Sequence, residues 1–184
     1  MGLKVISLDR NLATIYSWWE ANMDQGFSKL ASLHAELKEQ ARQHIQIIDR
    51  FSGKYSFLSN FYMCEVVFEG KTYPSTEHAY QAAKALDPTL RYQFTVGHSL
   101  TPGQAKRLGQ KLPLRADWED VKIDVMRYIL VSKFANPELR AKLRETGDAY
   151  LEEGNNWGDH FWGVDGYGWN HLGRLLMRIR TILL

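Results

Sequence analysis

One stretch constrains the fold more than any other: residues 71–84, which read K-T-Y-P-S-T-E-H-A-Y-Q-A-A-K. Pro74 disfavours the helical conformation at the residue before it, and Ser75 is a favourable N-cap. The stretch therefore predicts the end of a strand, a proline turn and a helix that starts at Thr76. Glu77 then lies in the first turn of that helix.

The predicted helix carries an acid and an amine on one face. Tyr80 or Gln81, and Lys84, follow Glu77 at offsets of three, four and seven. Glu77 and Lys84 are too far apart for a direct pair, but they could bracket a small polar ligand. The alternative is an ordinary capped helix, because the helix dipole favours an acid in the first turn and a lysine further along.

Length and composition indicate a single globular domain with an ordinary core. The chain has 184 residues, of which 45% are hydrophobic and 24% charged. A net charge of +2 is too small for a protein that coats nucleic acid. The six tryptophans and nine tyrosines could fill the core or, beside polar residues and glycines, line a pocket that stacks a flat ring.

Several classes of protein are not expected. A single cysteine, Cys64, excludes an internal disulfide framework, and the six histidines form no H-x-x-x-H or H-E-x-x-H pair, so no metal site is predicted. No apolar run approaches the roughly 18–20 residues of a membrane span, and the N-terminus is too short and too charged for a signal peptide. We therefore expect a cytoplasmic protein without membrane contact.

The first part of the chain reads as an appendage. Residues 5–8 could form a short strand, and residues 14–43 have a helical pattern that Gly26 divides in two. The apolar positions recur at three or four: Leu30, Leu33, Leu37 and Ala41. We predict a helical extension over residues 1–44, packed on a main domain over residues 45–184. It could serve as a lid, a dimer contact or a cover for the core.

The main domain begins with strands. Residues 45–51 alternate as a strand does, and residues 52–62 carry too many aromatic side chains for a solvated linker, so we expect a loop folded onto the body. Strands are predicted at 63–68 and 71–73, joined through a turn at Glu69-Gly70 as a hairpin.

Helices follow the hairpin. The helix that starts at Thr76 should end at Asp87-Pro88, and a short helix is expected around 90–96. Further helices are predicted at the following places: from Thr101-Pro102 to Gly109, from 118 to 134 with a stripe of Val121, Val125, Ile129 and Phe134, from Asn136-Pro137 to Gly147, and from Asn170, as its cap, through Leu175, Leu176 and Ile179.

Two segments outside the opening stretch could carry chemistry. Lys106, Arg107 and Lys111 make the helix before Gly109 basic, which suits either a solvated face or a phosphate contact. Residues 146–170 combine crowded glycines, acids and tryptophans. Buried carboxylates beside tryptophan rings suit acid–base catalysis, whereas the alternative is a tight surface loop with solvated acids.

The spaced motifs of the whole main domain resemble the NADAR superfamily, also called YbiA-like. They are F-x-G at 51–53, F-L-S-N-F-Y at 57–62, F-x-G-K-x-Y-P-S-T-E-H-A-Y-Q-A-x-K at 68–84, A-K-x-L-G at 105–109, W-x-x-x-K-x-x-V-M at 118–126, K-F at 133–134, E-L-R at 138–140, T-G-D-A-x-L-x-E at 146–153, W-x-D at 157–159, W-G at 162–163 and N-x-L-G-x-x-L-M at 170–177. The resemblance starts near Ile45, and the first 45 residues or so lie outside it.

The resemblance implies an α+β fold, mainly helical with a small antiparallel sheet. It also implies N-glycosidase chemistry, the cleavage of a bond between a ribose anomeric carbon and a nitrogen. Family substrates include phosphoribosyl-aminopyrimidine intermediates of riboflavin synthesis and ADP-ribose attached to guanine in nucleic acid. We therefore expect a small ribosyl compound or ADP-ribosylated nucleic acid as the partner. No metal or redox cofactor is implied.

The same resemblance assigns roles to residues. Glu77 matches the family's glutamate and would stabilise the positive charge that builds on the ribose, and Asp159 would be the second acid. Lys84 would bind a phosphate or hydroxyl, or attack the opened sugar as a Schiff base if burial lowers its pKa. The remaining candidates would bind substrate: Trp118 or Trp162 by stacking the base, Asn60 and Asn170 by hydrogen bonds, Lys106 and Arg107 by phosphate contacts, and Phe61 and Gly163 within the matching motifs.

Two departures from the family put the substrate in doubt: the N-terminal extension and the crowded segment G-N-N-W-G at 154–158. A protein that binds NAD or ADP-ribose without turnover is the main alternative, and it would need no acid. A structural protein that uses residues 14–43 as a partner helix is a third reading. The complete set of Glu77, Lys84 and Asp159 favours the enzyme.

Overall fold

Helices and two small sheets make up the part of the chain that the computed structural model describes, residues 27–42 and 46–182. The predicted α+β class is confirmed. The chain forms two compact units. Unit 1 contains the described residues up to Asp49 together with Asp148–Gly173, and unit 2 contains Arg50–Gly147 and the residues from Arg174 onward.

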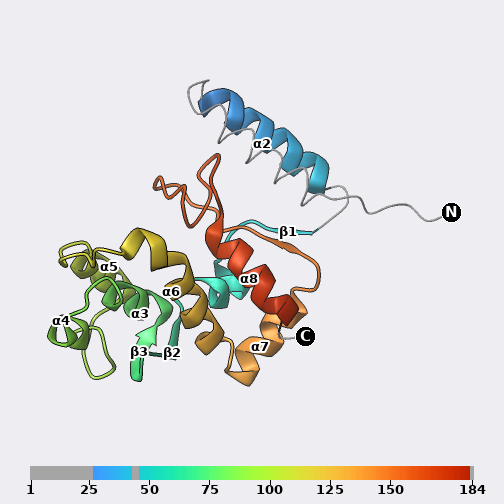
Figure 1. Ribbon diagram of the computed structural model, residues 1–184. Helices are drawn as coiled ribbons and strands as arrows, with labels where there is room; N and C mark the ends of the chain where they lie inside the picture. The colour runs from blue at the N-terminus through green and yellow to red at the C-terminus, as the bar shows by residue number, and fades with distance from the viewer. Residues whose placement is uncertain (1–26, 43–45, 183–184) are drawn as a thin grey trace. The chain divides into compact units, whose positions relative to one another are not determined.

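Unit 2 is built on the predicted hairpin. Strand β2 (Met63–Phe68) pairs antiparallel with β3 (Lys71–Ser75), and Figure 1 shows the two side by side. The connecting residues Glu69 and Gly70 both have positive φ, 46° and 73°. Two consecutive positive φ values match the right-handed twist of the strands, so the predicted Glu69-Gly70 turn is confirmed.

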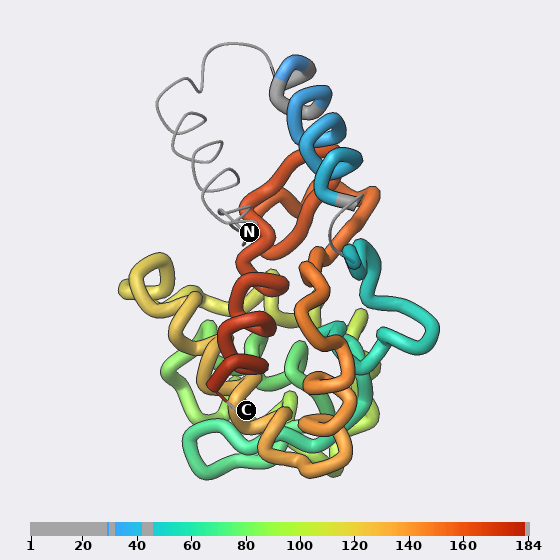
Figure 2. Tube along the Cα trace, turned by 90° about the vertical axis from the view of Figure 1, so that its right-hand side faces the viewer, coloured from blue at the N-terminus to red at the C-terminus, as the bar shows by residue number. Residues whose placement is uncertain are grey.

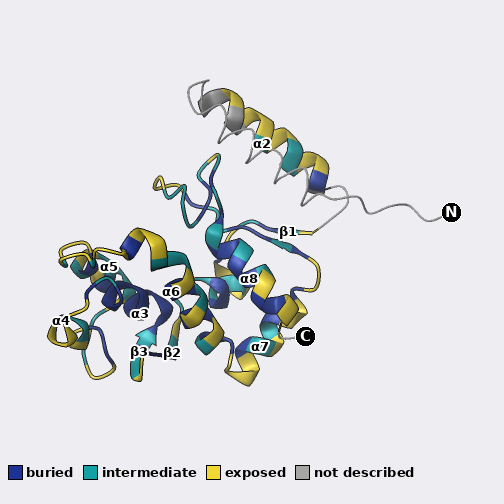
Figure 3. Ribbon diagram, in the orientation of Figure 1, coloured by how far each residue is buried: buried dark blue, intermediate teal, exposed yellow. Residues whose placement is uncertain are grey.

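Helix α3 (Thr76–Ala82) follows β3 directly and lies at the centre of unit 2. All seven of its residues are buried, as the dark blue ribbon in Figure 3 shows. Helices α5 (Pro102–Gly109) and α6 (Trp118–Lys133) pack against it, and α6 also packs against β2. A seven-residue helix is too short to be stable alone, so these neighbours hold it in place.

Local capping explains where the later helices begin. Thr101 and Gln104 form a reciprocal capping box at the start of α5. Asn136 Oδ1 accepts two backbone N–H bonds at the start of α7 (Pro137–Glu145). Gly147, with φ of 54°, follows the end of α7. The predicted limits of these helices are therefore confirmed.

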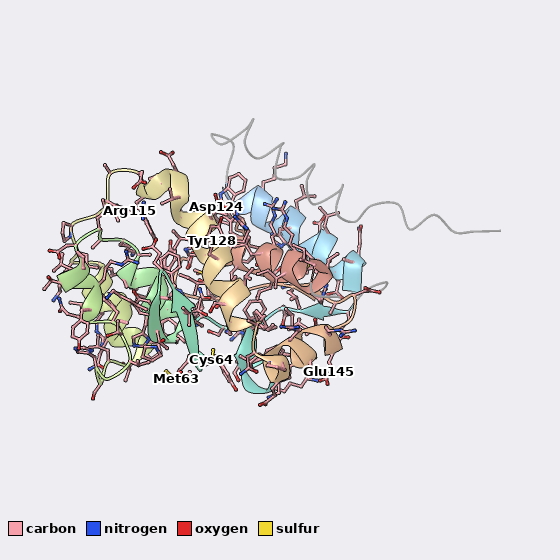
Figure 4. All side chains as sticks on the ribbon, turned by 60° about the horizontal axis from the view of Figure 1, so that its bottom comes forward. Met63, Cys64, Arg115, Asp124, Tyr128 and Glu145 are labelled. Carbon is pink, nitrogen blue, oxygen red and sulfur yellow. The ribbon has the colours of Figure 1, made fainter. Side chains whose placement is uncertain are left out.

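Helix α6 shows the predicted inward stripe. Val125, Ile129 and, just past its end, Phe134 are buried, while Val121 is partly exposed. Its opposite face carries Asp124 and Tyr128, which are labelled in Figure 4 together with Met63 and Cys64 at the start of β2.

Two predictions in unit 2 were wrong in their limits. Helix α3 ends at Ala82 and not at Asp87-Pro88, and the next helix, α4, runs over Pro88–Tyr92 instead of 90–96. The reason is that Asp87 Oδ1 accepts the N–H of Thr89 and Pro88 occupies the first turn. The pair Asp87-Pro88 therefore starts a helix.

The aromatic loop after Arg50 lies on the body of unit 2, as expected. Its first part is a 3₁₀ helix, η1 (Gly53–Leu58), which buries Phe57 and Leu58. Its second part holds Asn60, which is also buried.

Unit 1 contains a sheet that was not predicted. Strand β1 (Ile47–Ile48) pairs in parallel with β4 (Tyr150–Leu151), so the expectation of one small antiparallel sheet was incomplete. The predicted strand at 45–51 shortens to two residues. Its partner lies about a hundred residues later, and no local turn signal reports such a pairing.

Unit 1 also holds helix α2 (Phe27–Arg42). Of its predicted apolar stripe, Ala41 is buried and Leu33 is 37% exposed. The predicted strand at 5–8 and the helix break at Gly26 lie outside the described residues. The division into an extension over 1–44 and a domain over 45–184 stays a prediction.

The last helix, α8 (His171–Ile182), starts directly after Asn170, as predicted, and buries Leu175, Leu176 and Ile179. Its first three residues belong to unit 1 and the rest to unit 2. Within residues 27–42 and 46–182, no helix is both long and apolar enough to cross a membrane.

Candidate active site

A hydrogen-bonded cap fixes the first turn of α3. Ser75 Oγ accepts the backbone N–H of His78 and lies 2.8 Å from His78 Nδ1, while His78 Nε2 lies 2.9 Å from the carbonyl of Leu100. A carbonyl only accepts, so Nε2 donates and Nδ1 accepts from the Ser75 hydroxyl in the neutral ring. Burial lowers the pKa of His78, which the bond to Leu100 opposes, so the neutral ring is favoured.

Glu77 is a buried acid inside this fixed turn. Only 6% of its surface is exposed. Its backbone N–H donates to the carbonyl of Asn60 at 3.0 Å, which ties the aromatic loop to α3. Its Oε1 accepts a hydrogen bond of 2.8 Å from Gln81 Nε2, one turn further along the helix. One oxygen of the carboxylate therefore accepts a hydrogen bond from an uncharged amide.

Lys84 lies in the turn just after α3, and its backbone carbonyl accepts the N–H of Arg115 at 2.8 Å. Burial lowers the pKa of the Lys84 amine; the charge of Glu77 opposes this shift, and the charge of Lys106 adds to it. The amine also lies 5.8 Å from the centre of the Tyr80 ring. The acid and the amine that the sequence placed on one helix face therefore influence each other electrostatically.

Asn60 presents an unused acceptor near α3. The residue is 9% exposed, and its Oδ1 is buried with no hydrogen-bond partner among the described residues. Lys133, a fully buried lysine, holds the loop through its Nζ, which donates to the carbonyl of Ser59 at 2.7 Å. Phe61, which follows Asn60, is 44% exposed. A buried acceptor without a partner is costly, and a ligand donor would remove that cost.

The other predicted binding residues of unit 2 differ in exposure. Trp118 is only 4% exposed and packs on Tyr80, with ring centres 5.0 Å apart. Lys106 is half-buried, whereas Arg107 is exposed on the outer side of α5. Trp118 is therefore a packing partner of α3. Lys106 is the cation whose charge contributes to the lowered pKa of Lys84.

The predicted residues of unit 1 lie in the glycine-rich segment, whose orange-red trace turns back on itself in Figure 2. Asp159 Oδ1 accepts the backbone N–H groups of Phe161 and Trp162, at 3.2 and 2.9 Å. Trp162 is half-buried, and its ring meets the ring of Phe161 edge-on. One oxygen of Asp159 is thus engaged in holding the turn that carries Trp162.

Two further predicted residues have clear tasks in the fold of unit 1. Asn170 is fully buried; its amide donates to the carbonyl of Leu151 and accepts the N–H of Glu153. Its side chain therefore holds β4 and the residues after it. The prediction that this side chain caps α8 was wrong. At Gly163 a Cβ would lie 2.3 Å from the carbonyl of Glu153, so close backbone approach alone requires glycine there.

The family model described as the NADAR domain matches residues 48–184. The chain belongs to the NADAR family.

Similar proteins and a solved structure agree with this membership. N-glycosidase YbiA of Escherichia coli is 39% identical over 157 residues, which cover 80% of this chain and 96% of YbiA. A riboflavin biosynthesis protein of Vibrio vulnificus is 42% identical over 134 residues, which cover 70% of this chain and only 36% of that protein. The NMR structure of Escherichia coli YbiA matches with a TM-score of 0.64 and 39% identity, covering 77% of this chain and 90% of that chain.

Within this NADAR domain the predicted site divides between the units. Unit 2 groups Glu77 with Lys84, Lys106 and the Asn60 loop through the contacts above, and unit 1 holds Asp159, Trp162, Gly163 and Asn170. The pairing of Glu77 with Asp159 stays a prediction. In the described part of the chain no group of His, Cys, Asp and Glu side chains is arranged to hold a metal ion.

Two supporting residues were missing from the predicted set. Gln81 holds the carboxylate of Glu77, and Lys133 holds the loop of Asn60. The signal for Gln81 was its offset of four from Glu77, which places the two side chains on one helix face. Lys133 stands in the motif K-F at 133–134, but its contact with Ser59 spans 74 residues of sequence and no local pattern reports it.

Proposed function

We propose that this protein is an N-glycosidase that hydrolyses an N-ribosidic bond in a ribose phosphate or in an ADP-ribose derivative. The observation that carries the proposal is the buried carboxylate of Glu77, held by Gln81 and electrostatically coupled to the Lys84 amine. Relatives named N-glycosidase, of which this chain covers nearly the full length, support the same reaction class.

In this reaction water adds to the anomeric carbon, the bond from that carbon to the base nitrogen breaks, and the nitrogen takes up a proton. Positive charge builds on the ribose as the base leaves. The Glu77 carboxylate would stabilise that charge and accept a proton from the attacking water. Asp159 is the second acid of the proposal, acting through the oxygen that does not hold the turn.

Lys84 has two roles open to it. Its ammonium would bind a phosphate or hydroxyl, and the charge of Lys106 beside it would strengthen attraction of an anion. Burial also lowers its pKa, which was the condition for attack on the opened sugar: a larger neutral fraction of the amine could form a Schiff base with loss of water. Borohydride reduction followed by mass spectrometry would trap that adduct in wild type but not in Lys84→Met.

Asn60, Phe61 and the aromatic rings complete the proposed binding site. Asn60 Oδ1 would accept a hydrogen bond from a ribose hydroxyl or from the edge of the base. Phe61 is exposed enough to contact a base. Trp118, Trp162, Gly163 and Asn170 remain proposed substrate contacts beside the structural tasks described above, and the exposed Arg107 remains a proposed phosphate contact.

The test is incubation with three compounds: an oligonucleotide with ADP-ribosylated guanine, the aminopyrimidine ribose phosphate, and NAD. Mass spectrometry follows release of the base. Glu77→Gln should lower release by at least about a hundredfold, the scale of a lost acid–base group. Glu138→Gln makes the same change at an exposed acid and should keep wild-type release.

Two outcomes would contradict the proposal. Full turnover by Glu77→Gln would remove Glu77 from the mechanism. Tight binding of ADP-ribose by wild type, with no product from any of the three compounds over hours, would favour a binding module without catalysis.

A further inference from the structure

Gln81 is placed to orient the acid of the proposed reaction. It is 4% exposed, and its Nε2 donates to Glu77 Oε1 at 2.8 Å. Because a carboxylate only accepts, the amide nitrogen must face Glu77 and the amide oxygen must point away. The group in contact with the Gln81 amide oxygen therefore determines how strongly the orientation of the amide is restricted.

Gly109, the last residue of α5, receives the amide oxygen of Gln81. A Cβ at this glycine would lie 2.0 Å from Gln81 Oε1, 2.7 Å from its Cδ and 2.8 Å from its Cβ. The φ of Gly109 is not in the left-handed region, so the close contact and not the backbone conformation requires glycine here. Only a hydrogen atom fits between the two helices at this point.

The contact also selects one of the two orientations of the amide. Gln81 Oε1 has no conventional hydrogen-bond partner in the described residues, but a hydrogen on the Gly109 Cα points toward it, where a weak C–H···O contact can form. Turning the amide over would place its oxygen against the Glu77 carboxylate and its NH₂ against the glycine. Both contacts would then be repulsive.

We propose that Gly109 and Gln81 form a positioning device: the bare glycine of α5 fixes the Gln81 amide, which in turn sets the orientation of the Glu77 carboxylate. Gln81 and Gly109 are positioning residues and neither touches the substrate. The role in turnover rests on the proposed N-glycosidase function. The orientation of Glu77 does not.

Two variants test the device. Gln81→Met keeps the length of the side chain but removes the donor to Glu77. Gly109→Ala keeps the donor but forces Gln81 to move. Gly103→Ala is the matched control, since it makes the same substitution on the same helix, and its Cβ would meet only the Arg107 guanidinium at an ordinary 3.7 Å.

We expect kcat to fall roughly tenfold to a hundredfold in both variants, the scale of a misplaced catalytic group, with KM nearly unchanged. The acid limb of the pH–rate profile should move to higher pH in Gln81→Met, because a carboxylate that loses a hydrogen bond is protonated more easily. Lys84 and Lys106 are the same in all variants, so their charges cannot cause the difference. Gly103→Ala should match wild type.

A readout without substrate separates this inference from the proposed function. Carboxyl ¹³C NMR with labelled glutamate follows the titration of Glu77 in wild type, Gln81→Met and Gly109→Ala. A higher midpoint in Gln81→Met supports the device even if wild type releases no base. An unchanged midpoint in Gln81→Met would overturn it, as would wild-type kcat and pH profile in Gln81→Met or in folded Gly109→Ala.

Discussion

Removal of the Lys38 amine should loosen helix α2 within unit 1. Lys38 Nζ lies 2.6 Å from Oε1 of Glu152, and His34 Nε2 lies 3.6 Å from the other carboxylate oxygen. Glu152 is 2% exposed, so these two side chains of α2 stabilise a charge that water does not reach. Neither lies in the region that the family model matches, which starts at residue 48.

The magnitude follows from the burial of the two partners. Breaking a fully buried pair by removing one member costs about 3–5 kcal/mol, because the remaining charge is left uncompensated. Lys38 is 23% exposed, so water can replace part of its contact, and His34 remains beside Glu152. We therefore expect Lys38→Met to cost about 1.5–3 kcal/mol, the range of a single hydrogen bond to a charged group.

Hydrogen exchange of the α2 amides measures this cost. Since about 1.4 kcal/mol is a factor of ten in an equilibrium constant, opening of α2 should become roughly tenfold to a hundredfold more frequent. Lys142→Met is the matched control: its ion pair with Glu138 has the same N–O distance of 2.6 Å but both side chains are exposed. An exposed pair contributes about 0–1 kcal/mol, so the protection of the α2 amides in Lys142→Met should hardly differ from wild type.

The pH dependence has a defined sign. Burial alone would raise the pKa of Glu152, but hydrogen bonds from His34 and Lys38 and their charges outweigh it, so the pKa lies below its ordinary value. A lowered carboxyl pKa contributes stability above the unfolded value, near 4.3, and that stability is lost as pH falls through the folded value. Protection of α2 should therefore decrease with acid in wild type and less so in Glu152→Gln. Equal exchange in Lys38→Met and Lys142→Met would refute the anchoring of α2 by this pair.

Two further predictions concern one buried histidine, His78, and one buried lysine, Lys133, in unit 2. Because the pKa of His78 is lowered in the folded state, the unfolded state takes up the proton first as pH falls. The free energy of unfolding should therefore be highest above a pH of about 6.5 and decrease below it, by at most about 1.4 kcal/mol per pH unit. Urea unfolding should show this slope in wild type and lose it in His78→Gln. Lys133→Met should remove the charged donor to the Ser59 carbonyl, which keeps the longer bond of 3.3 Å from the N–H of Tyr62, and should cost about 1–3 kcal/mol in chemical unfolding. An unchanged midpoint would show that the Tyr62 bond alone is sufficient.

The parts of the fold that the sequence predicted are those set by neighbouring residues. The caps at Ser75, Thr101 and Asn136 and the Glu69-Gly70 turn each depend on two to four consecutive residues, so a local pattern determines them. The error at Asp87-Pro88 has the same origin, because an Asp before a proline can end one helix or cap the next, and only the position of Thr89 decides.

The parts that the sequence did not predict depend on residues far apart in the chain. The parallel pairing of β1 with β4 joins Ile47 to Tyr150, and the fixing of the Gln81 amide needs Gly109 on another helix. Hydrophobic period and propensity carry no information about such contacts. For the candidate site, sequence motifs supplied the acid and the amine, but not the groups that hold them.

The candidate residues differ in what their polar groups already do, and this difference orders the expected effects of mutation. Asn170 uses both ends of its amide within unit 1, so its replacement should lower stability first. Asn60 Oδ1 has no partner in the described residues, so Asn60→Ala should relieve an unpaired acceptor while removing a contact for substrate. A residue whose loss weakens turnover but not folding is one that the fold does not need. By that criterion Asn60 and Lys84 are stronger candidates for substrate contact than Asn170.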